Sequence, residues 1–209
     1  MEFEKMSLQA FVDELASDSP APGGGSVAAL CGAMASALVS MVANLTVGKE
    51  KYRDSWAIME EALVKSESLR GEFLKLMNED TESFNSFMAA MKMPRTTDEE
   101  KAARKKAMGE ASKAATEVPL RTLEACAKTS ELAIAAAKHG NPNTVSDAGS
   151  AALLAEAAGK AAAYNVRINM PGLSDEEFKE ECRSRMSCAL EKINHNSAKI
   201  AEIMDNVLG

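Results

Sequence analysis

Residues 19–48 contain no charged side chain, although Lys and Glu are common in the rest of the chain. This segment begins with a Pro-Ala-Pro turn and three glycines, Gly23, Gly24 and Gly25. It continues from Ser26 as a run of Ala, Gly, Ser, Val, Leu and Met. A helix that is small and apolar on every side is typical of the buried centre of a helical protein. We therefore predict that this segment forms the central helix of the fold.

The glycines before this helix allow two interpretations. Consecutive glycines let the backbone approach another group closely, and Ser26 is a residue type that caps helix N-termini. Together they would present free N–H groups at the positive end of the helix dipole, which suits an anion or a developing oxyanion. The alternative is a simple entry turn. The segment is not a nucleotide P-loop, since no Gly-Lys-Ser/Thr follows, and no strand pattern precedes it as a dinucleotide fingerprint would require.

Residues 27–47 are also long enough to span a bilayer. The run is dominated by small residues, includes several Ser, Asn and Thr, and lacks flanking aromatic belts. We therefore predict a buried helix in a protein that does not enter a membrane.

The composition restricts the function further. A net charge of -7 and an aromatic content of 4% argue against nucleic-acid binding. The four cysteines form no Cys-x-x-Cys pair, and with two histidines they give no zinc-site spacing, so no metal is predicted. The first ten residues are acidic and amphipathic without a secretory hydrophobic region, which predicts a cytoplasmic location.

Apolar residues recur at helical spacing along most of the chain, and strand patterns are scarce. We predict an all-α fold, a bundle of long antiparallel helices in one domain over residues 1–209. Residues 52–91 form either one helix or two with a break near Asn78, and Pro119 kinks the next helix. Capping boxes are expected at residues 97–100 and 174–177. The expected helices are 7–16, 26–46, 52–91, 97–138, 146–164 and 174–208, with the two small-residue helices, 26–46 and 146–164, as central partners.

Asp80 is the candidate catalytic residue. Helical spacing places it on one face with Phe73, Phe84 and Phe87. A carboxyl group against aromatic walls has a raised pKa, which suits a general acid or base. The alternative is an ordinary solvated acid. In the same way, a pair of asparagines on one face, Asn165 and Asn169, could bind a ligand or bond neighbouring helices.

These motifs together resemble the cyclodeaminase/cyclohydrolase family, which includes the C-terminal domain of formiminotransferase-cyclodeaminase and stand-alone bacterial methenyltetrahydrofolate cyclohydrolases. Two departures stand out: Asn78 stands where many relatives carry another acid, which counts against a two-carboxylate mechanism, and Ser150 replaces the usual valine. The matching segments extend over nearly the whole chain, at residues 19–29, 41–46, 79–82 with Phe84, 118–120, 140–141, 146–152 and 165–169.

The resemblance implies an all-α homodimer that acts on a tetrahydrofolate derivative, which can carry several glutamates, with no cofactor besides this substrate. It implies that Asp80 performs acid–base catalysis. Methenyltetrahydrofolate cyclohydrolase and formimidoyltetrahydrofolate cyclodeaminase activities both remain open, and the alternative is a helical scaffold or folate-binding protein without catalysis. The substrate-binding residues carried over from the resemblance are Pro22, Gly23, Gly24, Gly25, Ser26, Asn44, Asn141, Ser146, Asp147, Asn165 and Asn169.

Overall fold

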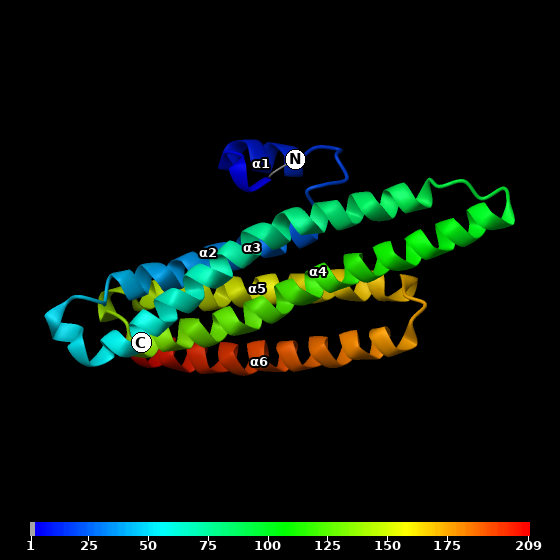
Figure 1. Cartoon of the computed structure of the whole chain (residues 1–209). Helices are drawn as coiled ribbons and strands as arrows, with labels where there is room; N and C mark the ends of the chain where they lie inside the picture. Colours follow the sequence, from blue (N-terminus) through cyan, green and yellow to red (C-terminus); the bar gives the residue numbers. More distant parts are fainter. Residues whose placement is uncertain (1–2) are drawn as a thin grey trace.

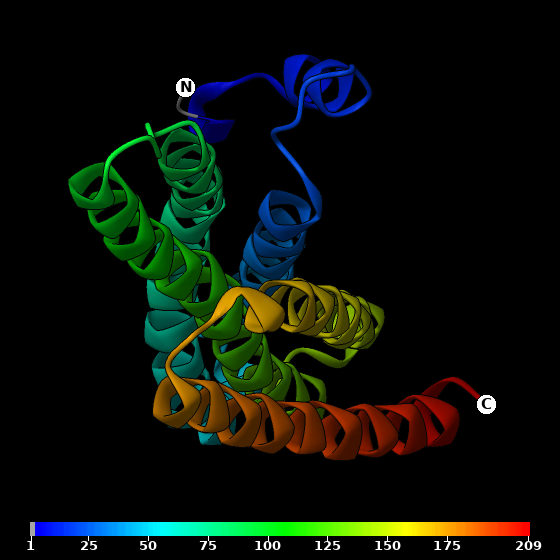
Figure 2. The ribbon, with the colours of Figure 1, turned by 90° about the vertical axis from the view of Figure 1, so that its right-hand side faces the viewer.

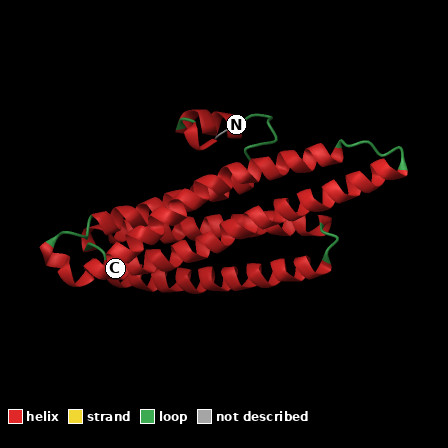
Figure 3. Cartoon of the chain, viewed as in Figure 1, coloured by secondary structure: helices red, strands yellow, loops and turns green. Residues whose placement is uncertain are grey.

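Six α-helices account for most of residues 3–209, which are the residues that the computed structural model describes, and no strand occurs among them (Figure 3). This confirms the predicted all-α fold. The helices are α1 Leu8–Leu15, α2 Gly24–Asn44, α3 Trp56–Met91, α4 Asp98–His139, α5 Val145–Asn169 and α6 Glu176–Leu208. Short 3-10 turns are η1 Phe3–Lys5, η2 Glu50–Ser55, η3 Pro142–Thr144 and η4 Met170–Gly172.

Helices α2 to α6 alternate in direction along the bundle, as predicted (Figure 1). An end view shows α2, α3, α4 and α5 grouped together, with α6 along the outside and α1 apart from them (Figure 2). Helix α2 packs against α3, α4 and α5, and α6 packs against α4 and α5. The charge-free segment is therefore at the centre, and its start lies at the same end of the bundle as the end of α5.

Small residues let the central helices approach closely. A Cβ added at Gly32 of α2 would lie 2.6 Å from Cζ of Phe73, so this glycine makes room for an aromatic ring of α3. Helix α2 is long and apolar enough to cross a membrane by length and composition, but 61% of its apolar window is buried inside the fold. A core helix of this kind meets the same criterion, and the close packing of α2 is what the sequence predicted.

Some of the predicted helix breaks, caps and ends agree with the structure, and others do not. Helix α3 continues through Asn78 without a break, and α4 continues through Pro119 as one helix. Thr97 and Glu100 form the predicted capping box. The cap of α6 was wrongly predicted, because Asp175 rather than Ser174 accepts from the backbone of the first turn. Helix α5 runs past its predicted end to residue 169, so both candidate asparagines are helical.

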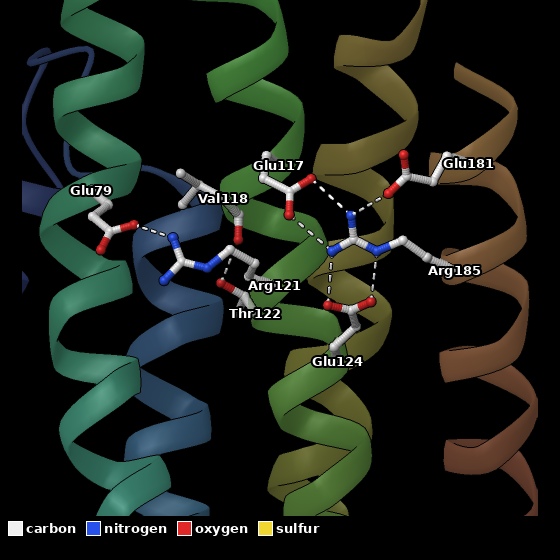
Figure 4. Close-up of polar contacts among 8 residues, drawn as sticks. All are labelled: Glu79, Glu117, Val118, Arg121, Thr122, Glu124, Glu181 and Arg185. Carbon is white, nitrogen blue, oxygen red and sulfur yellow. Dashed lines mark hydrogen bonds and ion pairs between the residues drawn. The ribbon is translucent and has the colours of Figure 1, made fainter. Parts of the chain in front are cut away.

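Arginine side chains tie α4 to its neighbours on both sides (Figure 4). Arg185 of α6 contacts two acids of α4, with 2.8 Å to Glu117 and 2.8 Å to Glu124. Glu124 and Glu117 raise the pKa of Arg185 above its usual range through these hydrogen bonds. On the other side, Arg121 of α4 lies 2.5 Å from Glu79 of α3. These pairs hold α4 in place where it forms one wall of the cavity described next.

Candidate active site

A cavity of about 370 Å³ lies where α2 begins and α5 ends. Its volume is in the range of small-molecule binding sites, about 300–1,000 Å³. Side chains and backbone from α2, α3, α4, α5 and η4 line it, so residues from distant parts of the sequence meet there. The lining includes Gly23, Gly24 and Gly25, Asp80, Phe84 and Phe87, Ser112 and Ala115, and Asn165 and Asn169.

The carboxyl group of Asp80 is held by the first turn of α2. The hydroxyl of Ser26 donates to Oδ2 of Asp80 at 2.8 Å. The backbone amide of Ser26 also stabilises the charged form of this carboxyl group. A second hydroxyl, that of Thr81, lies 3.4 Å from Ser26 Oγ. Asp80 of α3 is thus held by Ser26 of α2, which is 54 positions away in the sequence.

This geometry corrects the predicted role of Ser26. Gly23 occupies the N-cap position of α2 without a side-chain hydrogen bond, and Ser26 lies inside the first turn. Ser26 therefore does not cap the helix. The helix start was predicted to suit an anion or a developing oxyanion, and in the structure its positive end faces a carboxyl group of the protein itself. This group is the side chain of Asp80, which the hydroxyl and the backbone amide of Ser26 hold at the start of α2.

The three glycines have different surroundings. A Cβ added at Gly25 would lie 2.6 Å from Cγ of Asp80, which is inside van der Waals contact. A Cβ added at Gly24 would lie 3.6 Å from Nδ2 of Asn165, which is an ordinary van der Waals contact. A Cβ added at Gly23 would have no atom within 4 Å. Close approach of the backbone to the carboxyl group therefore requires glycine at position 25.

Burial raises the pKa of Asp80, and the hydroxyl and amide of Ser26 partly oppose this shift. Phe84 and Phe87 line the cavity beside it, as predicted. Phe73 does not, because its ring is fully buried against Gly32 in the core. A raised carboxyl pKa next to an open cavity is what a group that both accepts and donates protons needs.

The neighbouring polar residues of α3 point to other partners. Glu79 pairs with Arg121 of α4. Asn78 accepts from the amide of Phe3 at 3.1 Å and also contacts Glu4, so it fastens η1 to α3. Asp80 is the one acidic residue that lines the cavity within residues 3–209. The asparagine at position 78 therefore lies outside the residues that line the cavity.

The two asparagines of α5 both reach the cavity, as their shared face predicted. Nδ2 of Asn165 donates to the carbonyl of Ala161 at 2.9 Å. Nδ2 of Asn169 donates to the carbonyl of Ala115 in α4 at 2.6 Å. Within residues 3–209 neither carboxamide oxygen accepts a hydrogen bond, so both are acceptors available to a ligand.

Pro22 is buried next to the cavity, but four other candidates lie at the opposite end of the bundle. Asn44 is twenty residues along α2 from Gly24, about 30 Å at 1.5 Å per residue. Asn141 accepts from the hydroxyl of Tyr52 at 2.6 Å and joins the loops there. The remaining two, Ser146 and Asp147, are in the first turn of α5 at this same end. Substrate binding by these four residues stays a prediction.

Sequence reasoning missed the wall supplied by α4. Ser112 and Ala115 of α4 line the cavity together with Gly172 of η4. The signal was present in Pro119, which has no N–H and so frees the carbonyl four residues earlier. That carbonyl belongs to Ala115. Among residues 3–209 no group of three His, Cys, Asp or Glu side chains could hold a metal ion.

The fold and the cavity define an all-helical protein with a partly buried carboxyl group held by a glycine-rich helix start. A profile described as formiminotransferase-cyclodeaminase matches residues 7–188. The chain belongs to this family, which confirms the resemblance noted from the motifs.

Three relatives illustrate the relationship. The chain is 47% identical over 175 residues to the methenyltetrahydrofolate cyclohydrolase of Methylorubrum extorquens, covering 84% of each chain. It is 33% identical over 198 residues to the formimidoyltransferase-cyclodeaminase of Gallus gallus, covering 95% of this chain but 37% of that protein. The crystal structure of formiminotetrahydrofolate cyclodeaminase from Thermotoga maritima covers 100% of both chains, with a TM-score of 0.88 and 30% identity.

Proposed function

We propose that this chain is a one-carbon folate enzyme, and specifically a methenyltetrahydrofolate cyclohydrolase that uses Asp80 as its acid–base group. The observation that carries the proposal is the carboxyl group of Asp80, with its raised pKa, in a ligand-sized cavity beside Ser26. The relative bearing this name is 47% identical and matches 84% of both chains, which supports the hydrolase over other reactions.

The hydrolysis needs one group that takes a proton and returns it. Water adds to the carbon that bridges N5 and N10 of 5,10-methenyltetrahydrofolate, and the Asp80 carboxylate accepts one proton from it. The resulting carboxylic acid donates this proton to N5 while the N5–carbon bond breaks. The second proton of the water leaves to solvent as the formyl C=O forms, giving 10-formyltetrahydrofolate. A carboxyl pKa raised above its usual value by burial suits both halves of this cycle.

A second candidate is formimidoyltetrahydrofolate cyclodeaminase, favoured by the structural match that covers 100% of both chains. N10 attacks the carbon of the protonated formimidoyl group on N5. Asp80 accepts the N10 proton and donates it to the departing nitrogen, which leaves as ammonia. The same carboxyl group serves both reactions, so turnover of each folate must be measured.

The cavity offers a place for the substrate's reacting end. The carboxamide oxygens of Asn165 and Asn169 can accept from the pteridine N–H groups, while Phe84 and Phe87 provide apolar walls. Holding the reacting atoms in one geometry contributes much of an enzyme's rate. Neither proposed reaction transfers electrons, so we propose that the folate is the sole small molecule required, in a cytoplasmic enzyme.

We further propose that two copies of the chain associate through α2 and α5. These neighbouring helices expose apolar side chains at helical spacing, between 37% and 76% accessible: Met34 and Met41 of α2 with Leu45 just past its end, and Leu153, Tyr164 and Ile168 of α5. Ile168 also lines the cavity, so a partner there would border the site. Leu153→Glu should halve the mass measured by light scattering, whereas a monomeric parent would refute the dimer.

The absorbance of the methenyl chromophore tests the proposed activity. Purified protein should speed its loss from 5,10-methenyltetrahydrofolate, and Asp80→Asn should lower kcat at least about 100-fold. The matched control is Glu82→Gln, an exposed acid of the same helix, which should keep parental kcat. Appearance of the chromophore from 5-formimidoyltetrahydrofolate with ammonia would indicate the cyclodeaminase. If neither rate exceeds background, the non-catalytic scaffold replaces both proposals.

A further inference from the structure

The segment that precedes α2 is attached to α3 at both of its ends. At the start, Oδ1 of Asn78 accepts from the backbone amide of Phe3 at 3.1 Å. At the other end the chain passes into Gly25, where an added Cβ would lie 2.6 Å from Cγ of Asp80. We call residues 3–22 the N-terminal strap. Its two attachments lie within three consecutive residues of α3.

Part of the strap forms a wall of the candidate active site. Pro20 and Ala21 line the cavity. The hydroxyl of Ser19 donates to the carbonyl of Ala21 at 2.7 Å, which stabilises the turn. Pro22, which follows, is buried and joins the strap to the start of α2. A rotation of the strap about Pro22 would therefore move Pro20 and Ala21 and change the width of the cavity.

Few side chains hold the body of the strap to the bundle. Helix α1 stands apart from the other helices in the end view (Figure 2). Phe11 is the buried residue of α1, and its ring meets the ring of Phe3 edge-to-face, with 6.0 Å between centroids. Leu8 and Val12 of the same helix are 73% and 48% exposed. Segments with few buried apolar contacts open locally at low free energy. The strap is therefore the wall that moves most easily, because most of the other walls belong to long, packed helices.

Asn78 provides the polar contacts that hold the strap at its N-terminal end. Besides accepting from Phe3, its carboxamide donates from Nδ2 to the carboxylate of Glu4. This hydrogen bond lowers the pKa of Glu4, so Asn78 binds the charged form. A carboxylate at position 78 could accept from Phe3, but it could not donate and it would repel Glu4. The contact thus gives a role to the asparagine that departs from the family motif.

We propose that the N-terminal strap is a gate to the candidate active site, and that Asn78 is the positioning residue that holds it closed. The identity of the admitted ligand rests on the folate function proposed above, whereas the movement of the strap does not. With the strap closed, Pro20 and Ala21 shield Asp80 on one side of the cavity. With the strap open, ligand enters and product leaves past them. Closure of this kind keeps bulk water away from a reacting group.

The gate is tested first without any folate. Asn78→Asp should speed hydrogen exchange of the α1 amides about tenfold, because it breaks a hydrogen bond to a charged group and adds repulsion from Glu4. A water-soluble carbodiimide with glycine ethyl ester should label Asp80 at least about threefold faster, since the open strap uncovers its carboxyl group. Mass spectrometry of peptides measures both rates. Asn78→Asp/Glu4→Gln restores one donor and one acceptor at this contact, so both rates should return to parental values.

The matched control is Asn85→Asp, the same substitution at an exposed position of α3, which should keep the parental exchange and labelling rates. Parental exchange of α1 in Asn78→Asp, or an equal gain in the control, would overturn the anchoring role of Asn78. So would a double variant that exchanges as fast as Asn78→Asp. Faster exchange with unchanged labelling of Asp80 would overturn the gate.

The ligand probe is 5-formyltetrahydrofolate. At saturation it should slow both the exchange of α1 and the labelling of Asp80. It should dissociate about tenfold faster from Asn78→Asp than from the parent. Dissociation at the parental rate would overturn the gate. Faster labelling in Asn78→Asp, in a protein that neither binds the probe nor turns over either folate, would support the gate and refute the folate function. Turnover in a protein whose labelling Asn78→Asp leaves unchanged would do the reverse.

Discussion

Asn169 of α5 donates a hydrogen bond from Nδ2 to the carbonyl oxygen of Ala115 in α4, at 2.6 Å, across one wall of the candidate active site. In an unbroken helix this carbonyl would accept from the amide of residue 119. That residue is Pro119, which has no N–H. The proline therefore supplies the acceptor that holds a cavity residue in position.

This arrangement predicts a coupling between two distant positions. Asn169→Ala should destabilise the fold by about 1–2 kcal/mol, because it leaves the Ala115 carbonyl without its donor. In a Pro119→Ala background the restored N–H satisfies that carbonyl, so the same substitution should cost less by about 1 kcal/mol. Urea unfolding of the four proteins measures the difference. Asn165→Ala, whose bond stays within α5, should cost the same in both backgrounds.

The glycine that approaches Asp80 gives a second prediction. Gly25→Ala places a Cβ against the carboxyl group and must displace it, which should lower kcat/KM about 100-fold or more. The control is Gly71→Ala in the middle of α3, where a Cβ meets nothing within 4 Å. It should leave kcat unchanged and raise the free energy of unfolding by up to about 1 kcal/mol. Parental turnover by Gly25→Ala would remove the requirement for glycine there.

The Asn169–Ala115 hydrogen bond and the contact of Gly25 with Asp80 show how much of the site could be predicted from the sequence. The helical pattern, the buried segment, Asp80 and both asparagines could be predicted, because periodicity places residues on faces and the motifs resemble a known family. The sequence also shows that Pro119 frees a carbonyl. It does not show that Asn169 satisfies it, since the two residues meet only when α4 and α5 pack.

The wrong prediction that Ser26 caps α2 has the same origin. Ser26 follows three glycines and has the composition of a cap, but its hydroxyl binds Asp80, 54 positions along the chain. Local pattern does not distinguish these roles. Asn44 and Asn141 belong to motifs of the same family resemblance, and the length of α2 places them about 30 Å from the cavity, so substrate binding there stays a prediction.

The Ser26 hydrogen bond predicts how activity depends on pH. Burial raises the pKa of Asp80, and the Ser26 hydroxyl lowers it by favouring the carboxylate. Ser26→Ala should therefore raise this pKa further and move the acidic limb of kcat/KM to higher pH. Ser83→Ala is the matched control, because its hydroxyl donates to the backbone carbonyl of Asp80 and not to the carboxyl group. An unmoved limb in Ser26→Ala would mean that another group controls the rate.

The raised pKa of Asp80 also has a consequence for stability. For an acid whose pKa is higher in the folded state, the contribution to stability is full below the unfolded pKa and is lost as pH rises through the folded pKa. The amide in Asp80→Asn does not titrate, so this variant lacks the loss of stability that the parent shows as pH rises. Its free energy of unfolding relative to the parent should therefore increase from pH 3 to pH 7. Urea unfolding across this range measures the trend, which Glu82→Gln should not show, because Glu82 is exposed. A relative stability that falls with pH would contradict the buried carboxyl group.

Arg185 provides a last prediction, about how α6 is held to α4. Its guanidinium contacts Glu117, Glu124 and Glu181, and its side chain is 27% exposed. Arg185→Ala leaves three neighbouring carboxylates without their shared cation, which should lower the free energy of unfolding by about 1–3 kcal/mol. Arg183→Ala breaks one exposed pair within α6 and should cost less than about 0.5 kcal/mol. Because like charges repel most at low ionic strength, salt should narrow the gap between the two variants. Equal losses in the two variants would show that the Arg185 cluster does not fasten the helices together.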